Sequence, residues 1–108
     1  MADEAKYAAD VAKYTSTCDD ASVAGIVKHC GIALRSRDAS TVSCTDEGER
    51  KTVRDSFLKK KLGRTESDAE LDAAVLEVCE KMKDTRSKSR VTFYYLLAEK
   101  YGQLDVFR

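Results

Sequence analysis

The stretch from Lys88 to Gly102 reads KSRVTFYYLLAEKYG and contains the longest uninterrupted apolar run of the chain, Phe93 to Ala98. On a helix, its apolar residues occupy most of the circumference, and the polar strip between them consists of Thr92, Glu99 and Lys100. Its many β-branched and aromatic residues make a buried strand the alternative. The length of the stretch and its AEK ending favour a helix over about residues 88–101, closed by Gly102. A helix this apolar is expected at the centre of the fold.

Two further helices are predicted in the first 37 residues. Tyr7, Val11 and Tyr14 recur at i, i+4 and i+7, which indicates a helix over about residues 3–14. A second apolar stripe has the spacing i, i+4, i+7, i+11 and consists of Val23, Val27, Cys30 and Leu34. This second helix begins near residue 20 or 22. Gly31 either ends it as a left-handed cap or lies within a helix that continues to about residue 37, and the unbroken spacing favours continuation.

Two more helices are predicted in the middle of the chain, after a polar loop over residues 38–45. Within this loop, Thr41 to Cys44 alternate weakly and could be a short extended piece. The first begins at Asp46, which has capping-box spacing to Glu49, and ends at Leu62, before Gly63. The second begins at a capping box of Ser67 and Glu70. Its core-facing stripe is Leu71, Val75, Val78 and Met82.

Composition and helix count together predict an all-α, compact single domain of about five helices spanning residues 1–108, with the last helix (about 88–101) central. The 108 residues suffice for one core. The 19 basic and 19 acidic residues leave no net charge, so no global attraction to nucleic acid is expected. The longest apolar run has six residues, too few to cross a membrane. The MADE start lacks a secretory signal, and a cytoplasmic protein is expected.

The cysteines show no recognised motif. Cys18, Cys30, Cys44 and Cys79 lie 12, 14 and 35 residues apart, whereas zinc knuckles and redox motifs need spacings of about two to four. Two disulfides are possible in principle, but a reducing cytoplasm disfavours them. Cys30 and Cys79 fall at core-facing helical positions and are therefore predicted to be small buried hydrophobes. A metal site that combines His29 with several cysteines is disfavoured, and no metal or cofactor is predicted.

Basic residues are concentrated between Arg50 and Arg64, where seven bases and one acid give a charge of +6. Arg50, Arg54 and Lys61 project between two apolar stripes of the predicted helix. Such bases either extend their stems over apolar surface to reach water, which we favour, or form an anion site. A second cluster, Arg86 to Arg90, opposes the dipole of the last helix and would suit a phosphate or carboxylate. The candidate anion-binding residues are Arg50, Arg54, Lys61, Arg86, Lys88 and Arg90.

No catalytic constellation is evident, and no catalytic residue is predicted. The single histidine, His29, projects roughly 120° from the centre of its helix's apolar face and is expected at the rim of the core or in solvent. No nucleophile elbow, P-loop or dinucleotide fingerprint is present. We therefore interpret the chain as a non-enzymatic binding or adaptor module with a protein partner. The alternative is a protein that binds an anion, nucleotide or RNA through a basic face, and the third is an enzyme with an unfamiliar site.

Several blocks of the sequence resemble a known family. They are GIVKH (25–29), GIALRSRD (31–38), VSC (42–44), LKKKLG (58–63) and KSRVTFYYLLAEK (88–100). The family is a group of short bacterial proteins classed only as a domain of unknown function, and the resemblance extends from about Ala24 to Leu104. It implies a bacterial, cytoplasmic protein with a single domain. It implies no activity, and no catalytic residue is carried over.

Overall fold

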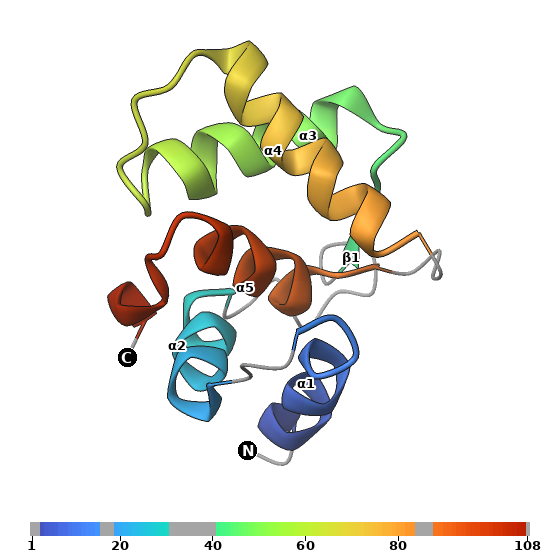
Figure 1. Cartoon of the computed structure of the whole chain (residues 1–108), viewed down its shortest axis with the longest axis vertical. Coiled ribbons are helices and arrows are strands. Elements are labelled where there is room, and N and C mark those ends of the chain that lie inside the picture. The colour runs from blue at the N-terminus through green and yellow to red at the C-terminus, as the bar shows by residue number, and fades with distance from the viewer. Residues whose placement is uncertain (1–2, 16–18, 31–40, 84–87, 108) are drawn as a thin grey trace.

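Helix α5 (Arg90–Lys100) runs between two groups of helices (Figure 1). The computed structural model describes residues 3–15, 19–30, 41–83 and 88–107. Helices α1 (Asp3–Val11) and α2 (Asp20–Cys30) lie on one side of α5, and α4 (Asp68–Lys81) lies on the other. Every residue from Arg90 to Ala98 is buried. The predicted all-α fold with a central last helix is therefore confirmed.

The last helix begins two residues later than predicted, because Lys88 and Ser89 form a short strand. This strand, β2 (Lys88–Ser89), pairs antiparallel with β1 (Thr41–Val42), and Thr41 lies opposite Ser89. Backbone groups that bond across this pair are not available for the first turn of a helix. The short extended piece that the sequence allowed within Thr41 to Cys44 is thus present over Thr41–Val42, and the helix predicted from about Lys88 begins at Arg90.

The helix predicted over residues 46–62 is divided in two. Regular α3 (Glu47–Thr52) continues directly into η2 (Val53–Lys59), a π-helical segment with i→i+5 bonding. At its end, the Leu62 amide donates to the Phe57 carbonyl over 2.9 Å. The wider turn brings residues four and five apart to one face, which explains why both apolar stripes of this segment are buried. These stripes consist of Val53, Phe57, Leu58 and Leu62.

Most helix boundaries follow the predicted capping signals. The Ser67 hydroxyl accepts from the Glu70 amide at 3.3 Å, and Gly63 and Gly102 both have φ of +66°. The N-cap at Asp46 forms, but the second half of its capping box does not, because the Glu49 carboxylate bonds to Arg90 instead. Helix α1 ends at residue 11, and a turn replaces the predicted last part of this helix. The question of continuation beyond Gly31 lies outside the described residues.

The C-terminal segment folds back onto α2. The 3₁₀ helix η3 (Leu104–Phe107) packs against α2 where Gly25 has no side chain. A Cβ atom at Gly25 would lie 1.8 Å from the Phe107 carbonyl oxygen. Phe107 is buried, whereas Val106 is 42% exposed. None of the described helices combines the length and apolar character that crossing a membrane requires.

Candidate functional site at the arginines beside the disulfide

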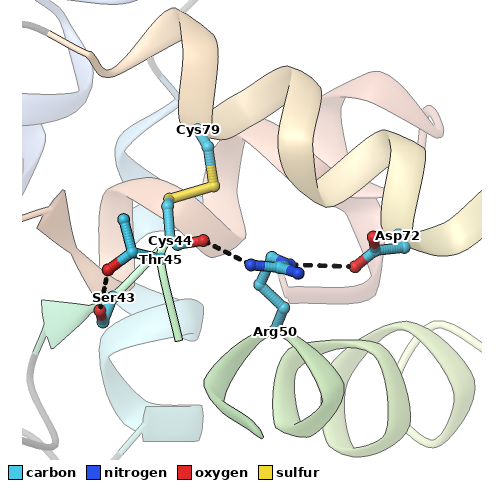
Figure 2. Close-up of a disulfide and its surroundings, with 6 residues drawn as sticks. All are labelled: Ser43, Cys44, Thr45, Arg50, Asp72 and Cys79. Carbon is cyan, nitrogen blue, oxygen red and sulfur yellow. Dashed lines mark hydrogen bonds and ion pairs between the residues drawn. A yellow bond between two sulfur atoms is a disulfide. The ribbon is translucent and has the colours of Figure 1, made fainter. Parts of the chain in front are cut away.

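Cys44 and Cys79 form a disulfide that ties the loop after β1 to α4 (Figure 2). Their Cα atoms are 6.0 Å apart although the residues are 35 positions apart in the chain. Disulfides were expected to be disfavoured, and this expectation is wrong for the Cys44–Cys79 pair. Spacing alone could not reveal it, because the fold brings the two cysteines together. Cys79 is buried as predicted, with 8% exposed surface, but it is not a free thiol.

Cys30 is a free thiol on α2 and is partly buried against the core, in agreement with its predicted core-facing position. Burial raises the pKa of Cys30 to about 11, and the positive charge of Arg90 opposes this rise only in part. A thiol with this pKa is protonated at neutral pH and is a poor nucleophile. Cys18 lies outside the described residues.

Arg50 joins the disulfide-bonded loop to α4 without a covalent bond (Figure 2). Its Nη1 donates to the Cys44 carbonyl at 2.7 Å, and its Nε donates to Asp72 Oδ1 at 3.3 Å. Arg54 donates to the same Asp72 oxygen at 2.6 Å. One carboxylate on α4 therefore binds two candidate arginines, one from α3 and one from η2. Neither guanidinium is freely exposed, since their side chains retain 19% and 13% of their accessible surface.

Arg90 is also engaged within the protein. Its guanidinium donates to the Glu49 carboxylate, to the Tyr94 hydroxyl at 2.9 Å and to the Thr41 carbonyl at 3.3 Å. Only 8% of Arg90 is exposed. Burial raises the pKa of Tyr94, and the neighbouring Arg90 charge opposes this rise. A buried cation with three kinds of acceptor holds α3, β1 and α5 together.

The remaining candidate anion ligands are placed differently. Lys61 is exposed, and its Nζ lies 5.3 Å from the centroid of the Phe107 ring. Lys88 is half-buried in β2, and Arg86 lies outside the described residues. The structure therefore brings Arg50 and Arg54 together at Asp72, places Arg90 on Glu49 and leaves Lys61 at the far end of η2.

Most of the acidic residues that form ion pairs with the basic segment, residues 50–64, lie in the stretch that follows it. Between Glu66 and Glu80 there are six acids and no base, and this stretch packs against α3 and η2. Besides the Asp72 contacts, Lys59 pairs with Asp68 and Arg64 pairs with Glu66, each at 2.5 Å. A signal for these partners was present in the sequence, because the acidic run directly follows the basic one across a glycine turn.

His29 lies at the edge of an aromatic cluster, in agreement with the predicted rim position. It is exposed, and its ring centroid is 6.0 Å from that of Phe57 and 5.9 Å from that of Phe107. Burial of part of the ring, followed by the charge of Lys61, lowers the pKa of His29. Among the described residues, no group of three or more His, Cys, Asp or Glu side chains could hold a metal ion.

Comparison with known proteins gives a family but no activity. The family model described as "Protein of unknown function (DUF2853)" matches residues 6–105. No curated protein matches the chain. The matched residues include helices α2 to α5, the disulfide and the arginine contacts. The chain therefore belongs to the DUF2853 family of proteins of unknown function.

Proposed function

We propose that the protein is a non-enzymatic binding module and that it contacts a protein partner through the outer face of α4. The internal use of the charged groups supports this proposal. Arg50, Arg54 and Arg90, which would be the strongest anion ligands, join elements of the fold to one another. Arg50 and Arg54 bind Asp72 and so hold α4 against α3 and η2. The outer face of α4 is therefore held in a defined position, where a partner could bind it.

The outer face of α4 has an apolar strip that resembles the buried face in its spacing. Ala69, Ala73 and Leu76 recur at i, i+4 and i+7, and all three are exposed. Leu76 is 44% exposed and is one of two large hydrophobic residues that are exposed in the described part of the chain. Small alanines next to a leucine allow a partner's apolar side chains to approach closely. This exposed strip is the observation that carries the proposal.

The test compares two variants that each place a charge on an exposed apolar residue. Partners are cross-linked in the cells that make the protein and quantified by mass spectrometry for the wild type, Leu76→Asp and Val106→Asp. We expect Leu76→Asp to lower recovery of the main partner by at least about tenfold, since a central apolar contact is worth 1–2 kcal/mol or more. Val106→Asp is the matched control and should retain the partner. Equal recovery with all three chains, or equal loss in both variants, would contradict the proposal.

A second candidate function is anion or RNA binding at the end of η2. Lys60 and Lys61 are both exposed, and no acid among the described residues forms an ion pair with either of them. Lys61 also lies beside the exposed ring of His29, whose pKa its charge helps to lower. A phosphate at this position would meet two ammonium groups next to an aromatic side chain.

Salt dependence tests this second candidate. Binding of a fluorescent single-stranded RNA should weaken as salt increases, because each phosphate contact releases counterions. Lys60→Gln/Lys61→Gln should flatten the slope by about one to two units, and the control Lys51→Gln/Lys81→Gln should not. No binding at low salt, or the same slope in both variants, would exclude an RNA-binding role for these lysines.

A further inference from the structure

The two cysteines of the Cys44–Cys79 bridge differ in exposure. Cys79 is on the inner side of α4 and is 8% exposed. Cys44 is half-buried in a short loop, and both of its neighbours, Ser43 and Thr45, are exposed. The loop side of the bridge is therefore the more exposed side, and we expect a dissolved thiol to reach Cys44 more readily than Cys79.

The elements joined by the bridge also have contacts that do not depend on it. Arg50 spans the same gap, because it donates both to the Cys44 carbonyl and to Asp72 of α4. The inner face of α4 is packed independently through Leu71 and Val75, both with no exposed surface. On the other side of the loop, β1 remains paired with β2. Cleavage of the bridge therefore removes one link among several, and the two sulfurs should stay close enough to re-form it.

The third described cysteine does not compete with the bridge. The raised pKa of Cys30, about 11, keeps its thiol protonated at neutral pH. Thiol–disulfide exchange needs a thiolate, so Cys30 is not expected to attack either sulfur. We therefore expect the pair to open and close without exchange with Cys30.

We propose that Cys44–Cys79 is a reversible thiol–disulfide exchange site that is opened by dithiol reductants and attacked at Cys44. A thiolate of the dithiol attacks Cys44 Sγ, the Cys44–Cys79 bond breaks, and Cys79 leaves as a thiolate that takes up a proton. The second thiol of the reductant, as its thiolate, then displaces the Cys44 thiolate, which is also protonated. Two electrons pass from the dithiol to the protein, and the reductant becomes a disulfide. A disulfide oxidant such as oxidised glutathione reverses the reaction.

The first experiment opens the bridge in the native protein. The full-length oxidised chain is treated with dithiothreitol in the absence of denaturant, free thiols are alkylated, and modified peptides are identified by mass spectrometry. We expect Cys44 and Cys79 to become alkylated while the helical circular dichroism is retained. Oxidised glutathione should then restore the same bridge. The proposal is overturned if the bridge opens only after urea is added, or if opening it abolishes the helical signal.

The second experiment identifies the sulfur that is attacked. Brief treatment of the oxidised chain with glutathione, followed at once by alkylation of the released thiol, traps a mixed disulfide, which is expected on Cys44 in at least about tenfold excess over Cys79 because of the difference in access. Cys30→Ser is the control and should open and close at the wild-type rate. The double variant Cys44→Ser/Cys79→Ser should fold with the same helical signal. Glutathione on Cys79, a changed rate in Cys30→Ser or an unfolded double variant would each contradict the proposal.

Discussion

At the scale of single residues, Gly25 shows how one missing side chain sets a contact between distant parts of the chain. A Cβ atom there would lie 1.8 Å from the Phe107 carbonyl oxygen, a backbone atom that cannot rotate away. We expect Gly25→Ala to lower the free energy of unfolding by about 1–3 kcal/mol, as overpacking does, even though alanine favours a helix. Urea unfolding followed by circular dichroism measures this change.

Gly48→Ala is the matched control for this prediction. Gly48 is also in a helix, but a Cβ atom there would meet only the Asp46 side chain, at 3.2 Å. A flexible carboxylate can move by a few tenths of an ångström, so the stability of Gly48→Ala should stay within about 1 kcal/mol of the wild type. If Gly25→Ala and Gly48→Ala are equally stable, then the close packing of η3 on Gly25 does not require a glycine at this position.

The pKa of His29 tests the aromatic edge of the core. In the folded protein this pKa lies below the ordinary value of 6.5, first because of burial and second because of Lys61. At pH values between the pKa of His29 in the folded protein and its ordinary value of 6.5, the unfolded chain binds more protons than the folded protein. The contribution of His29 to stability is therefore fully present above pH 6.5, and it is lost as the pH falls through the lower pKa of the folded protein.

NMR titration of the His29 ring gives the measurement. We expect a pKa below 6.5 in the wild type and an intermediate value in Lys61→Gln, because removal of the charge leaves the burial unchanged. A wild-type pKa at or above 6.5, or an identical value in Lys61→Gln, would contradict the predicted placement of these two side chains.

At the scale of secondary-structure elements, Asp72 is the residue through which α4 binds both α3 and η2. Asp72→Asn removes the charge that Arg50 and Arg54 share, and Arg54 Nε is already buried without a hydrogen-bond partner in the described part of the chain. We expect the free energy of unfolding to fall by about 1–3 kcal/mol, since two partly buried cations lose their counterion. Urea unfolding again measures the effect.

The exposed pair between Glu80 and Lys83 provides the comparison for Asp72. Both of these side chains are more than 70% exposed, and Glu80→Gln should change stability by less than about 0.5 kcal/mol. Equal effects of Glu80→Gln and Asp72→Asn would mean that burial adds nothing to the arginine contacts.

At the scale of the whole molecule, the disulfide closes a large loop that contains α3, η2 and most of α4. Its cysteines are 35 residues apart, and a loop of this length restricts the unfolded chain by roughly 4 kcal/mol. We expect Cys44→Ser/Cys79→Ser to lose about this much stability in urea relative to the oxidised wild type and still to unfold cooperatively. A loss of less than about 1 kcal/mol would show that the unfolded chain is already restricted in this region.

The helices and most of their ends could be predicted from the sequence, because the signals for them are local. Apolar spacing placed α2, α4 and α5, and Gly63 and Gly102 take up the left-handed conformation expected of them. The apolar character of the last helix was enough to place it at the centre, since a helix without a polar face must be covered on all sides.

Tertiary structure decided the partners of the cysteines and arginines. The Cys44–Cys79 bridge, the shared carboxylate of Asp72 and the bond between Arg90 and Glu49 all join residues at least 18 positions apart. No local pattern specifies such contacts, because they depend on how α4 and α5 pack against α3 and η2. The sequence could identify a run of positive charge, but only the packing of the acidic run against it determines which cations remain available to a ligand.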